Sequence, residues 1–193
     1  MTEVRHITFI RHGKTPGNER KAYIGITDEK LSTDGQELIK NRVYPPADIV
    51  FSSPLARCIE TAEIIYPGME PVIVLDLRET DFGLFEGKNY QELADNPEYQ
   101  RWIDSGGTEA FPKGESPAAA NERFLRGFQE VLKNIGDAED ISIVAHGGTI
   151  MAVLSHYFGG DFYSYMTENG EGYTFDLSHD SIFSGLRPGS FTR

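Results

Sequence analysis

The chain has 193 residues, of which 39% are hydrophobic and 25% charged, and its formal net charge at pH 7 is −12. This length fits one domain with a substantial core, while the acidic balance excludes a typical nucleic-acid surface, which needs fields of Lys and Arg. No apolar run reaches the roughly 20 residues that span a bilayer, and the first residues lack the apolar core of a signal peptide, so we expect a cytoplasmic protein without a membrane partner.

Apolar runs and helical patterns alternate along the chain. In chain order they predict a strand over 5–10, a helix over 33–43, a strand over 48–52, a helix over 54–65, a strand over 72–75, a helix over 116–135, a strand over 141–145, a helix over 149–158, and closing strands over 173–177 and 181–186. This alternation predicts a three-layer α/β/α sandwich with a largely parallel central sheet. Two of the helices follow a Ser-Pro pair, Ser53-Pro54 and Ser116-Pro117, in which the serine can cap the helix and the proline can occupy its first position.

The interval 82–117 differs from the rest of the chain. It carries several glycines, prolines and aromatic residues between short helical patches, which predicts a lid-like insertion in a single domain over 1–193, with a long surface loop as the alternative. Four of its aromatic residues, Tyr90, Tyr99, Trp102 and Phe111, allow two interpretations. They either stack on a nucleobase-like ring of a ligand or form a small core of the insertion itself.

Three polar clusters follow predicted strands. They are Arg11-His12-Gly13, the segment from Ser53 to Arg57, and His146-Gly147-Gly148. Because the carboxyl ends of parallel strands share one edge of a sheet, we expect these clusters to meet. A guanidinium offers a fork of donors to phosphate oxygens, and an imidazole can attack phosphorus or carry a proton. The acidic net charge does not oppose such a site, because the local field attracts the ligand.

A run of carboxylates from Asp76 to Glu86 follows the predicted strand over 72–75. Expulsion of an alkoxide from a phosphate monoester at neutral pH needs an acid that protonates the leaving oxygen. One carboxyl group of this run can supply the proton, or the run is a solvated acidic loop without chemistry.

The spacing of the histidines is not that of a metal site, and a single cysteine cannot form a thiolate cluster. The five histidines are His6, His12, His146, His156 and His179, and none of them forms an HxH or an i, i+4 pair. We therefore expect no metal, and we assign no role to His6, His156 or His179. The single cysteine, Cys58, excludes an internal disulfide and a thiolate cluster, and we expect it to be a small buried hydrophobe.

Four motifs together resemble the histidine phosphatase superfamily. They are Arg11-His12-Gly13-Lys14-Thr15 with Asn18, Ser53-Pro54-Leu55-Ala56-Arg57 with Thr61-Ala62, Arg78-Glu79 followed by Phe82-Gly83 and Glu86-Gly87, and His146-Gly147-Gly148. They occur in the order of that family and span most of the chain. The resemblance implies a phosphoglycerate mutase-like fold and phosphoryl transfer through a covalent phosphohistidine, without a metal or another cofactor.

The resemblance also implies a role for each matched residue. His12 is the nucleophile, Arg11, Arg57 and His146 bind the phosphoryl oxygens, and Glu79 is the proton donor. Asn18, Gly25 and Gly147 match positions that contact phosphate or substrate in relatives. The chain departs from the family at Lys14, where many relatives have Glu, and at Phe85, where many have Trp.

Within the superfamily the choice lies between a phosphatase and a cofactor-dependent phosphoglycerate mutase. The mutases hold a second anionic group with additional basic residues, whereas the interval 89–114 has only Arg101 and Lys113. We therefore expect hydrolysis of a small phosphorylated metabolite, and the insertion looks most like that of α-ribazole phosphatases, which grade into broad-specificity and sugar-phosphate phosphatases. The other alternative is an inactive phosphate-binding regulatory module. Such a module would be expected to lack one of His12, Arg57, Glu79 and His146, all of which are present.

Overall fold

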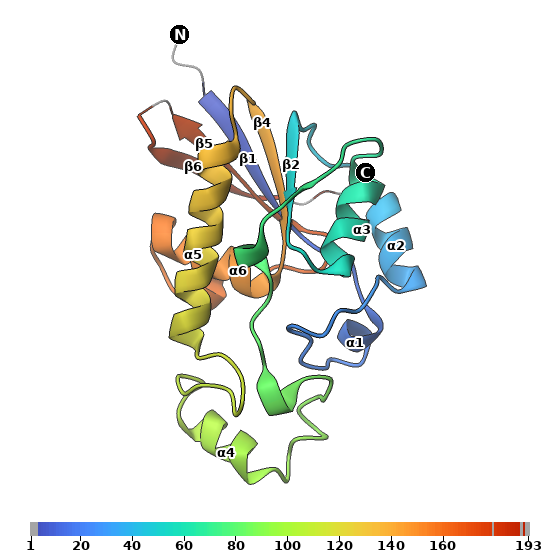
Figure 1. Ribbon diagram of the computed structural model, residues 1–193, viewed down its shortest axis with the longest axis vertical. Coiled ribbons are helices and arrows are strands. Elements are labelled where there is room, and N and C mark those ends of the chain that lie inside the picture. Colours follow the sequence, from blue (N-terminus) through green and yellow to red (C-terminus); the bar gives the residue numbers. More distant parts are fainter. Residues whose placement is uncertain (1–3, 179, 190, 192–193) are drawn as a thin grey trace.

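Six strands form one sheet in the computed structural model, which describes residues 4–178, 180–189 and 191. The strands are β1 (Val4–Arg11), β2 (Ile49–Ser52), β3 (Val72–Ile73), β4 (Asp140–Ala145), β5 (Gly172–Ser178) and β6 (Phe183–Gly189). Their order is β3-β2-β4-β1-β5-β6 (Figure 1). The first four are parallel to one another, β5 is antiparallel to β1, and β6 is antiparallel to β5. The predicted, largely parallel sheet is confirmed.

Helices cover both faces of the sheet. The helices are α1 (Pro16–Glu19), α2 (Thr33–Lys40), α3 (Ala56–Ile65), α4 (Pro97–Asp104), α5 (Pro117–Asn134) and α6 (Gly147–Phe158), with short 3-10 turns at Leu75–Leu77, Gly83–Phe85 and Phe162–Tyr165. Of these, α5 and α6 lie on one face of the sheet and α2 and α3 on the other, whereas α1 and α4 lie below the sheet in Figure 1. Among the described residues, no helix is both long enough and apolar enough to cross a bilayer.

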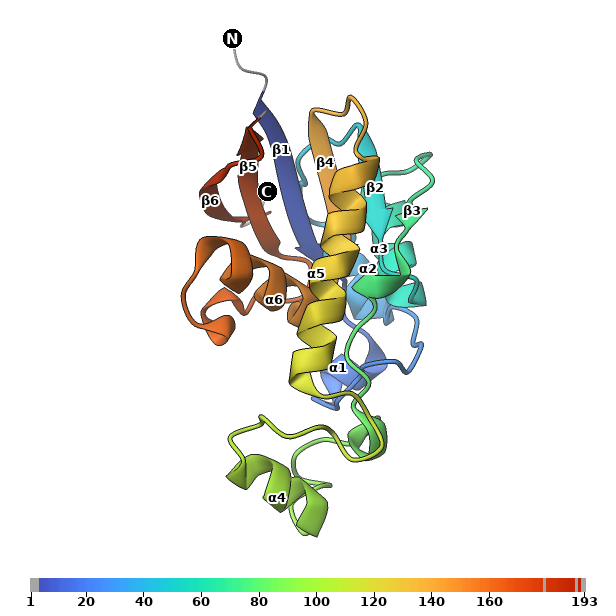
Figure 2. The ribbon, with the colours of Figure 1, turned by 60° about the vertical axis from the view of Figure 1, so that its left-hand side comes forward.

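The two faces follow from the alternation of side chains along the strands. Ile7 and Phe9 of β1 point to the core that also contains Phe128 of α5, whereas Ile10 points to the opposite core, which contains Cys58 of α3. Helix α6 contributes to the first core, and α2 packs against α3 (Figure 2). The three-layer α/β/α prediction is therefore confirmed.

The two Ser-Pro pairs behave differently. Ser116 caps α5 as predicted, because its Oγ accepts a hydrogen bond from the Ala119 N–H at 3.1 Å. The prediction that Ser53 caps a helix starting at Pro54 is wrong: α3 begins at Ala56 without a side-chain cap. The Ser53 N–H donates instead to the Val144 carbonyl at 3.0 Å, so the extended backbone of β2 continues through this residue.

Other differences concern where elements end. The helix predicted over 33–43 stops at Lys40, and the strand predicted over 72–75 ends at Ile73, because a 3-10 turn starts at Leu75. The 3-10 turn redirects the chain before the carboxylate run.

The segment 82–117 extends beyond the carboxyl ends of the parallel strands, at the lower end of Figure 1. Its Tyr99 and Phe111 are buried and pack with Trp102, at ring-centroid distances of 6.1 Å for Tyr99–Trp102 and 5.0 Å for Trp102–Phe111. Tyr90 is 56% exposed. Tyr99, Trp102 and Phe111 therefore form the small core that was one of the two interpretations of these aromatic residues.

Candidate active site

His12 follows β1 directly and is held by backbone pairing. Its N–H donates to the Ala145 carbonyl at the end of β4, at 3.0 Å, and its side chain is buried. Nδ1 lies 2.7 Å from the Gly13 carbonyl oxygen. Since a carbonyl oxygen only accepts hydrogen bonds, Nδ1 carries the proton and Nε2 carries the lone pair.

Arg57 lies in the first turn of α3 with its side chain fully buried. Its Nε donates to Nε2 of His12 at 3.3 Å, and its terminal nitrogens donate to the carbonyls of Thr27 at 2.9 Å, Gly25 at 2.7 Å and Ile24 at 3.4 Å. A guanidinium has five N–H donors, so these four bonds leave one N–H without a partner among the described residues.

The carboxylate of Glu86 orders the loop that holds Arg57. It accepts hydrogen bonds from the N–H groups of Gly25 at 3.1 Å and Ile26 at 3.1 Å, and from the Thr27 hydroxyl at 2.6 Å. A Cβ on Gly25 would lie 1.8 Å from the Thr80 carbonyl oxygen, so only glycine fits there. In this structure Gly25 supports Arg57 through its carbonyl, and its N–H is committed to Glu86.

His146 follows β4 and precedes α6, and its ring is fully buried. The ring centroids of His146 and His12 are 5.1 Å apart. Nε2 of His146 lies 2.7 Å from the Ser53 Oγ and 3.4 Å from the Cys58 Sγ. The predicted meeting of the three strand ends is therefore observed.

Burial and neighbouring charge keep both imidazoles neutral. Burial, together with the positive charge of Arg57, holds the pKa of His12 and the pKa of His146 well below the usual 6.5. Burial also raises the pKa of the Cys58 thiol to about 12, so Cys58 is a thiol at neutral pH and the prediction of a small buried residue is confirmed.

Arg11 ends β1 beside the start of α6. One of its terminal nitrogens donates to the Thr167 carbonyl at 2.6 Å, whereas its buried Nε has no hydrogen-bond partner within the described part of the chain. A Cβ on Gly147 would lie 3.6 Å from that Nε, which places Gly147 next to Arg11. A buried donor without an acceptor fits a site for an anion.

Glu79 is 9% exposed, so it is not part of a solvated acidic loop. Its Oε1 accepts the Thr80 N–H at 2.8 Å, and its Oε2 accepts the Gly148 N–H at 3.3 Å. Gly148 lies in the first turn of α6, two residues after His146. The carboxylate therefore lies at the same end of the sheet as the two histidines.

Asn18 lies at the edge of this cluster. Its Oδ1 accepts the Thr15 N–H at 3.2 Å, and it lines a cavity of about 550 Å³ together with Arg11, Lys14 and Lys21. The structure thus brings together all eight residues to which the sequence assigned a function, with Gly25 in a supporting position.

A family model of the histidine phosphatase superfamily (branch 1) matches residues 7–179. The chain belongs to the histidine phosphatase superfamily. The uncharacterised phosphatase PhoE of Bacillus subtilis is 30% identical over 164 residues, which cover 80% of this chain and 78% of that protein. A 2,3-bisphosphoglycerate-dependent phosphoglycerate mutase of Corynebacterium efficiens is 27% identical over 189 residues, which cover 78% and 75% of the two chains.

The fold of this superfamily member is also found in solved structures. The α-ribazole phosphatase from Shigella flexneri superposes with a TM-score of 0.85 at 22% identity, over 97% of each chain. This likeness confirms the predicted phosphoglycerate mutase-like fold, and the family match confirms the predicted type of enzyme.

Two residues of this histidine phosphatase superfamily member were missed by sequence reasoning. Asn169 is buried, and its Nδ2 donates to the His12 carbonyl at 3.0 Å, but a loop residue 157 positions away gives no local signal. Arg123 is buried in α5 beside Glu79. Its signal is a charged residue on the apolar face of a helix, between Ala120 and Phe124.

The remaining histidines lie away from this cluster. His6 is hydrogen-bonded to Asp176 at 2.9 Å, His156 is exposed on α6, and His179 lies outside the described residues. Over the described ranges, no group of three or more His, Cys, Asp or Glu side chains could hold a metal ion.

Proposed function

We propose that this superfamily member is a phosphomonoesterase that hydrolyses a small phosphorylated metabolite through a covalent phosphohistidine on Nε2 of His12. The observation that carries the proposal is the protonation state of the His12 imidazole and the hydrogen bonds of its two ring nitrogens. Its imidazole is buried and neutral, its Nδ1 proton is bound by the Gly13 carbonyl, and its Nε2 lone pair lies beside the Arg57 guanidinium. A neutral imidazole next to fixed cations suits attack on a phosphoryl group.

In the first step, the Arg57 Nε–H that donates to His12 Nε2 in this structure turns to a phosphoryl oxygen of the substrate, and the freed Nε2 attacks phosphorus in line with the leaving oxygen. The N–P bond forms as the P–O bond to the leaving group breaks, and the leaving oxygen takes a proton from the Glu79 carboxyl. Arg11, Arg57 and His146 bind the other three oxygens, where negative charge is stabilised in the transition state. Support comes from the Nε of Arg11 and from one N–H of Arg57, because neither has a hydrogen-bond partner in the part of the chain that the structure describes.

In the second step, water attacks the phosphohistidine. The Glu79 carboxylate takes a proton from the water as the new P–O bond forms, the N–P bond breaks, and inorganic phosphate leaves. Two smaller barriers thus replace one large barrier. No metal or other cofactor is needed in this scheme.

Charge in the insertion favours water over a second phosphorylated acceptor. Of the two basic residues in the interval 89–114, Arg101 is paired with Glu109 at 3.7 Å. A bisphosphate intermediate would find few cations there, so hydrolysis is favoured over the mutase reaction. We further propose that the segment 82–117 closes over the substrate.

The substrates to be tested first are α-ribazole phosphate and sugar phosphates. Packing of Tyr99, Trp102 and Phe111 against one another removes most of the reason to expect ring stacking on a substrate. A compact phosphorylated metabolite without a large ring fits this arrangement as well as α-ribazole phosphate does. Phosphate release from a panel that contains both α-ribazole phosphate and sugar phosphates therefore discriminates between substrates with a large ring and substrates without one.

The decisive experiment measures release of inorganic phosphate from an aryl phosphate with and without a chelator. We expect equal rates, and loss of activity on chelation would contradict the metal-free mechanism. Incubation with 3-phosphoglycerate and 2,3-bisphosphoglycerate should yield little 2-phosphoglycerate. Efficient isomerisation would instead identify a mutase, and the absence of any turnover across the panel would identify a binding module.

A further inference from the structure

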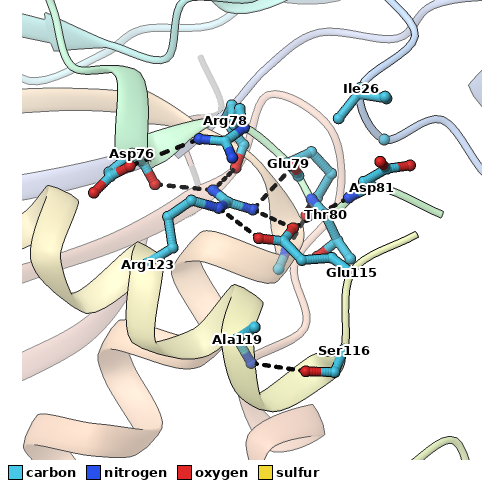
Figure 3. A network of polar contacts seen from close by, with 12 residues as sticks. Ile26, Asp76, Arg78, Glu79, Thr80, Asp81, Glu115, Ser116, Ala119 and Arg123 are labelled. Atoms are coloured by element: carbon cyan, nitrogen blue, oxygen red, sulfur yellow. Dashed lines mark hydrogen bonds and ion pairs between the residues drawn. The ribbon is translucent and has the colours of Figure 1, made fainter. Parts of the chain in front are cut away.

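Arg123 is a charged residue in an apolar layer, and the chemistry above does not use it. Its side chain is 3% exposed, on the face of α5 that carries Ala120 and Phe124. Two of its nitrogens, Nε and one terminal nitrogen, bind the two carboxylate oxygens of Glu115 at 2.8 and 2.6 Å (Figure 3). A charge so deeply buried is costly unless it is paired in this way.

The remaining donors of Arg123 bind the backbone that leads to Glu79. They donate to the carbonyls of Asp76 at 3.0 Å, Arg78 at 2.6 Å and Glu79 at 3.3 Å. One guanidinium therefore fixes three of the four peptide carbonyls from residue 76 to residue 79 (Figure 3).

Glu115 holds the chain on the other side of Glu79. Its carboxylate accepts the Asp81 N–H at 3.3 Å, and its own N–H donates to the Asp81 carbonyl at 2.9 Å. The pair formed by Arg123 and Glu115 thus binds the backbone both before and after the proposed proton donor.

Helix packing removes the remaining freedom of this segment. A Cβ on Gly127 of α5 would lie 2.9 Å from the carbonyl carbon of Asp76, so the segment touches the helix backbone directly. On the other side, the hydroxyl of Thr149 in α6 donates to the Leu77 carbonyl at 3.2 Å.

We propose that the Arg123–Glu115 ion pair positions the Glu79 carboxyl against the leaving oxygen, so that both residues act on catalysis through Glu79 without touching the substrate. This proposal rests on the role assigned to Glu79 in the proposed function. Within the described ranges, the Glu79 carboxylate itself is bound only by the N–H groups of Thr80 and Gly148, so its place depends on the backbone that carries it.

The test uses Glu115→Gln and Arg123→Lys, with Arg126→Gln as the matched control. Arg126 is in the same helix and binds the Asp76 carboxylate at 3.2 Å, but its side chain is 60% exposed. For each variant, kcat/KM is measured on aryl phosphates whose leaving groups span a wide range of pKa, well below the measured Tm. This parameter reports the step in which Glu79 donates its proton.

We expect Glu115→Gln to reduce kcat/KM about tenfold for phenyl phosphate and less than about twofold for 2,4-dinitrophenyl phosphate, because only the poor leaving group needs the proton. Arg123→Lys should act in the same direction, and Arg126→Gln should match the wild type. If Arg123→Lys does not fold, Glu115→Gln decides alone. A lowered Tm with an unchanged dependence on the leaving group would overturn the proposal, because it would show a purely structural ion pair.

A second arm separates this proposal from the proposed function. In a Glu79→Gln background, Glu115→Gln should cause no further loss on phenyl phosphate, because its effect acts through Glu79. A full additional loss would contradict the positioning role. If Glu79→Gln alone leaves the dependence on the leaving group unchanged, the acid role of Glu79 fails, whatever the outcome at Glu115.

Discussion

Nε2 of His12 and Nε of Arg57 are 3.3 Å apart, and the guanidinium donates to the ring nitrogen that we propose as the nucleophile. The hydrogen bond occupies the Nε2 lone pair in this structure, so it must break before Nε2 can attack phosphorus. It also adds to burial in keeping the imidazole unprotonated. The same arginine thus helps to keep the imidazole neutral, and in the proposed mechanism its released N–H binds a phosphoryl oxygen.

Replacement of His12 by Ala should remove the covalent intermediate. We expect kcat to fall roughly 10³-fold or more, since alanine has no group that can attack phosphorus. Brief incubation with a ³²P-labelled substrate, followed by denaturation, should give an acid-labile label on the wild type and none on the variant. The same label on His12→Ala would exclude His12 as the phosphorylated residue.

Glu79→Gln should slow poor leaving groups far more than good ones. The amide cannot donate a carboxyl proton, so we expect a loss of about 10²- to 10⁴-fold on phenyl phosphate and a much smaller loss on 2,4-dinitrophenyl phosphate. A series of aryl phosphates gives the slope of log kcat/KM against the leaving-group pKa. Equal slowing of all substrates would remove Glu79 from the acid role.

Arg57→Lys should be severe although the charge is kept. A lysine cannot reproduce the bonds to His12 and to the carbonyls of Thr27 and Gly25, so we expect kcat/KM to fall roughly 10²-fold. The control is Arg20→Lys, the same substitution at an exposed position. Similar kinetics for the two variants would show that position 57 needs only a positive charge.

Gly148→Ala should impair proton donation by Glu79 more than it lowers the stability of the fold. The new Cβ would lie 2.5 Å from Oε1 of Glu79 and must displace that carboxylate, so we expect roughly a 10²-fold loss on poor leaving groups. Gly147→Ala places its Cβ no closer than 3.6 Å to Arg11 and should cost less. The steric explanation is wrong if the two variants lose equal activity.

Stability should fall as the pH drops below about 6.5. His12 and His146 have folded-state pKa values well below 6.5, so below that pH the unfolded chain binds more protons than the folded chain. Each histidine then lowers the free energy of unfolding by up to about 1.4 kcal/mol per pH unit, and neither contributes a slope above that range.

Urea unfolding between pH 7.5 and 5.5 measures this slope. His12→Gln should reduce it by about half, whereas His156→Gln, at an exposed position, should leave it unchanged. A flat profile for the wild type would contradict lowered pKa values for the two rings, because it would show that the folded and unfolded chains bind the same number of protons.

The sequence alone was sufficient for most of the fold and for the meeting of the polar clusters that follow the parallel strands. Alternating apolar runs predicted the strands and helices, and the parallel arrangement then required the residues after β1, β2 and β4 to meet at one edge. Arg57 and His146 could be placed beside His12 for this reason, without any knowledge of side-chain contacts. The ends of the elements were less predictable, because a 3-10 turn such as Leu75–Leu77 has no periodicity of its own.

Ser53-Pro54 and Ser116-Pro117 carry the same local signal, but only the second pair starts a helix. The Ser53 backbone is held by a neighbouring strand and its hydroxyl binds His146, and both partners lie more than 90 residues away in the chain. A local sequence pattern predicts only the hydrogen bonds between residues within a few positions of each other, such as a helix cap.

The sequence by itself determined the fold class, the family and the residues that gather around His12. The tertiary structure decided which side chains hold those residues in place: Arg123 and Glu115 around Glu79, Glu86 behind the loop that binds Arg57, and Asn169 on the backbone of His12. The reason is physical. A buried polar group must find a hydrogen-bond partner, and its partner is set by the packing of distant segments rather than by its neighbours in sequence.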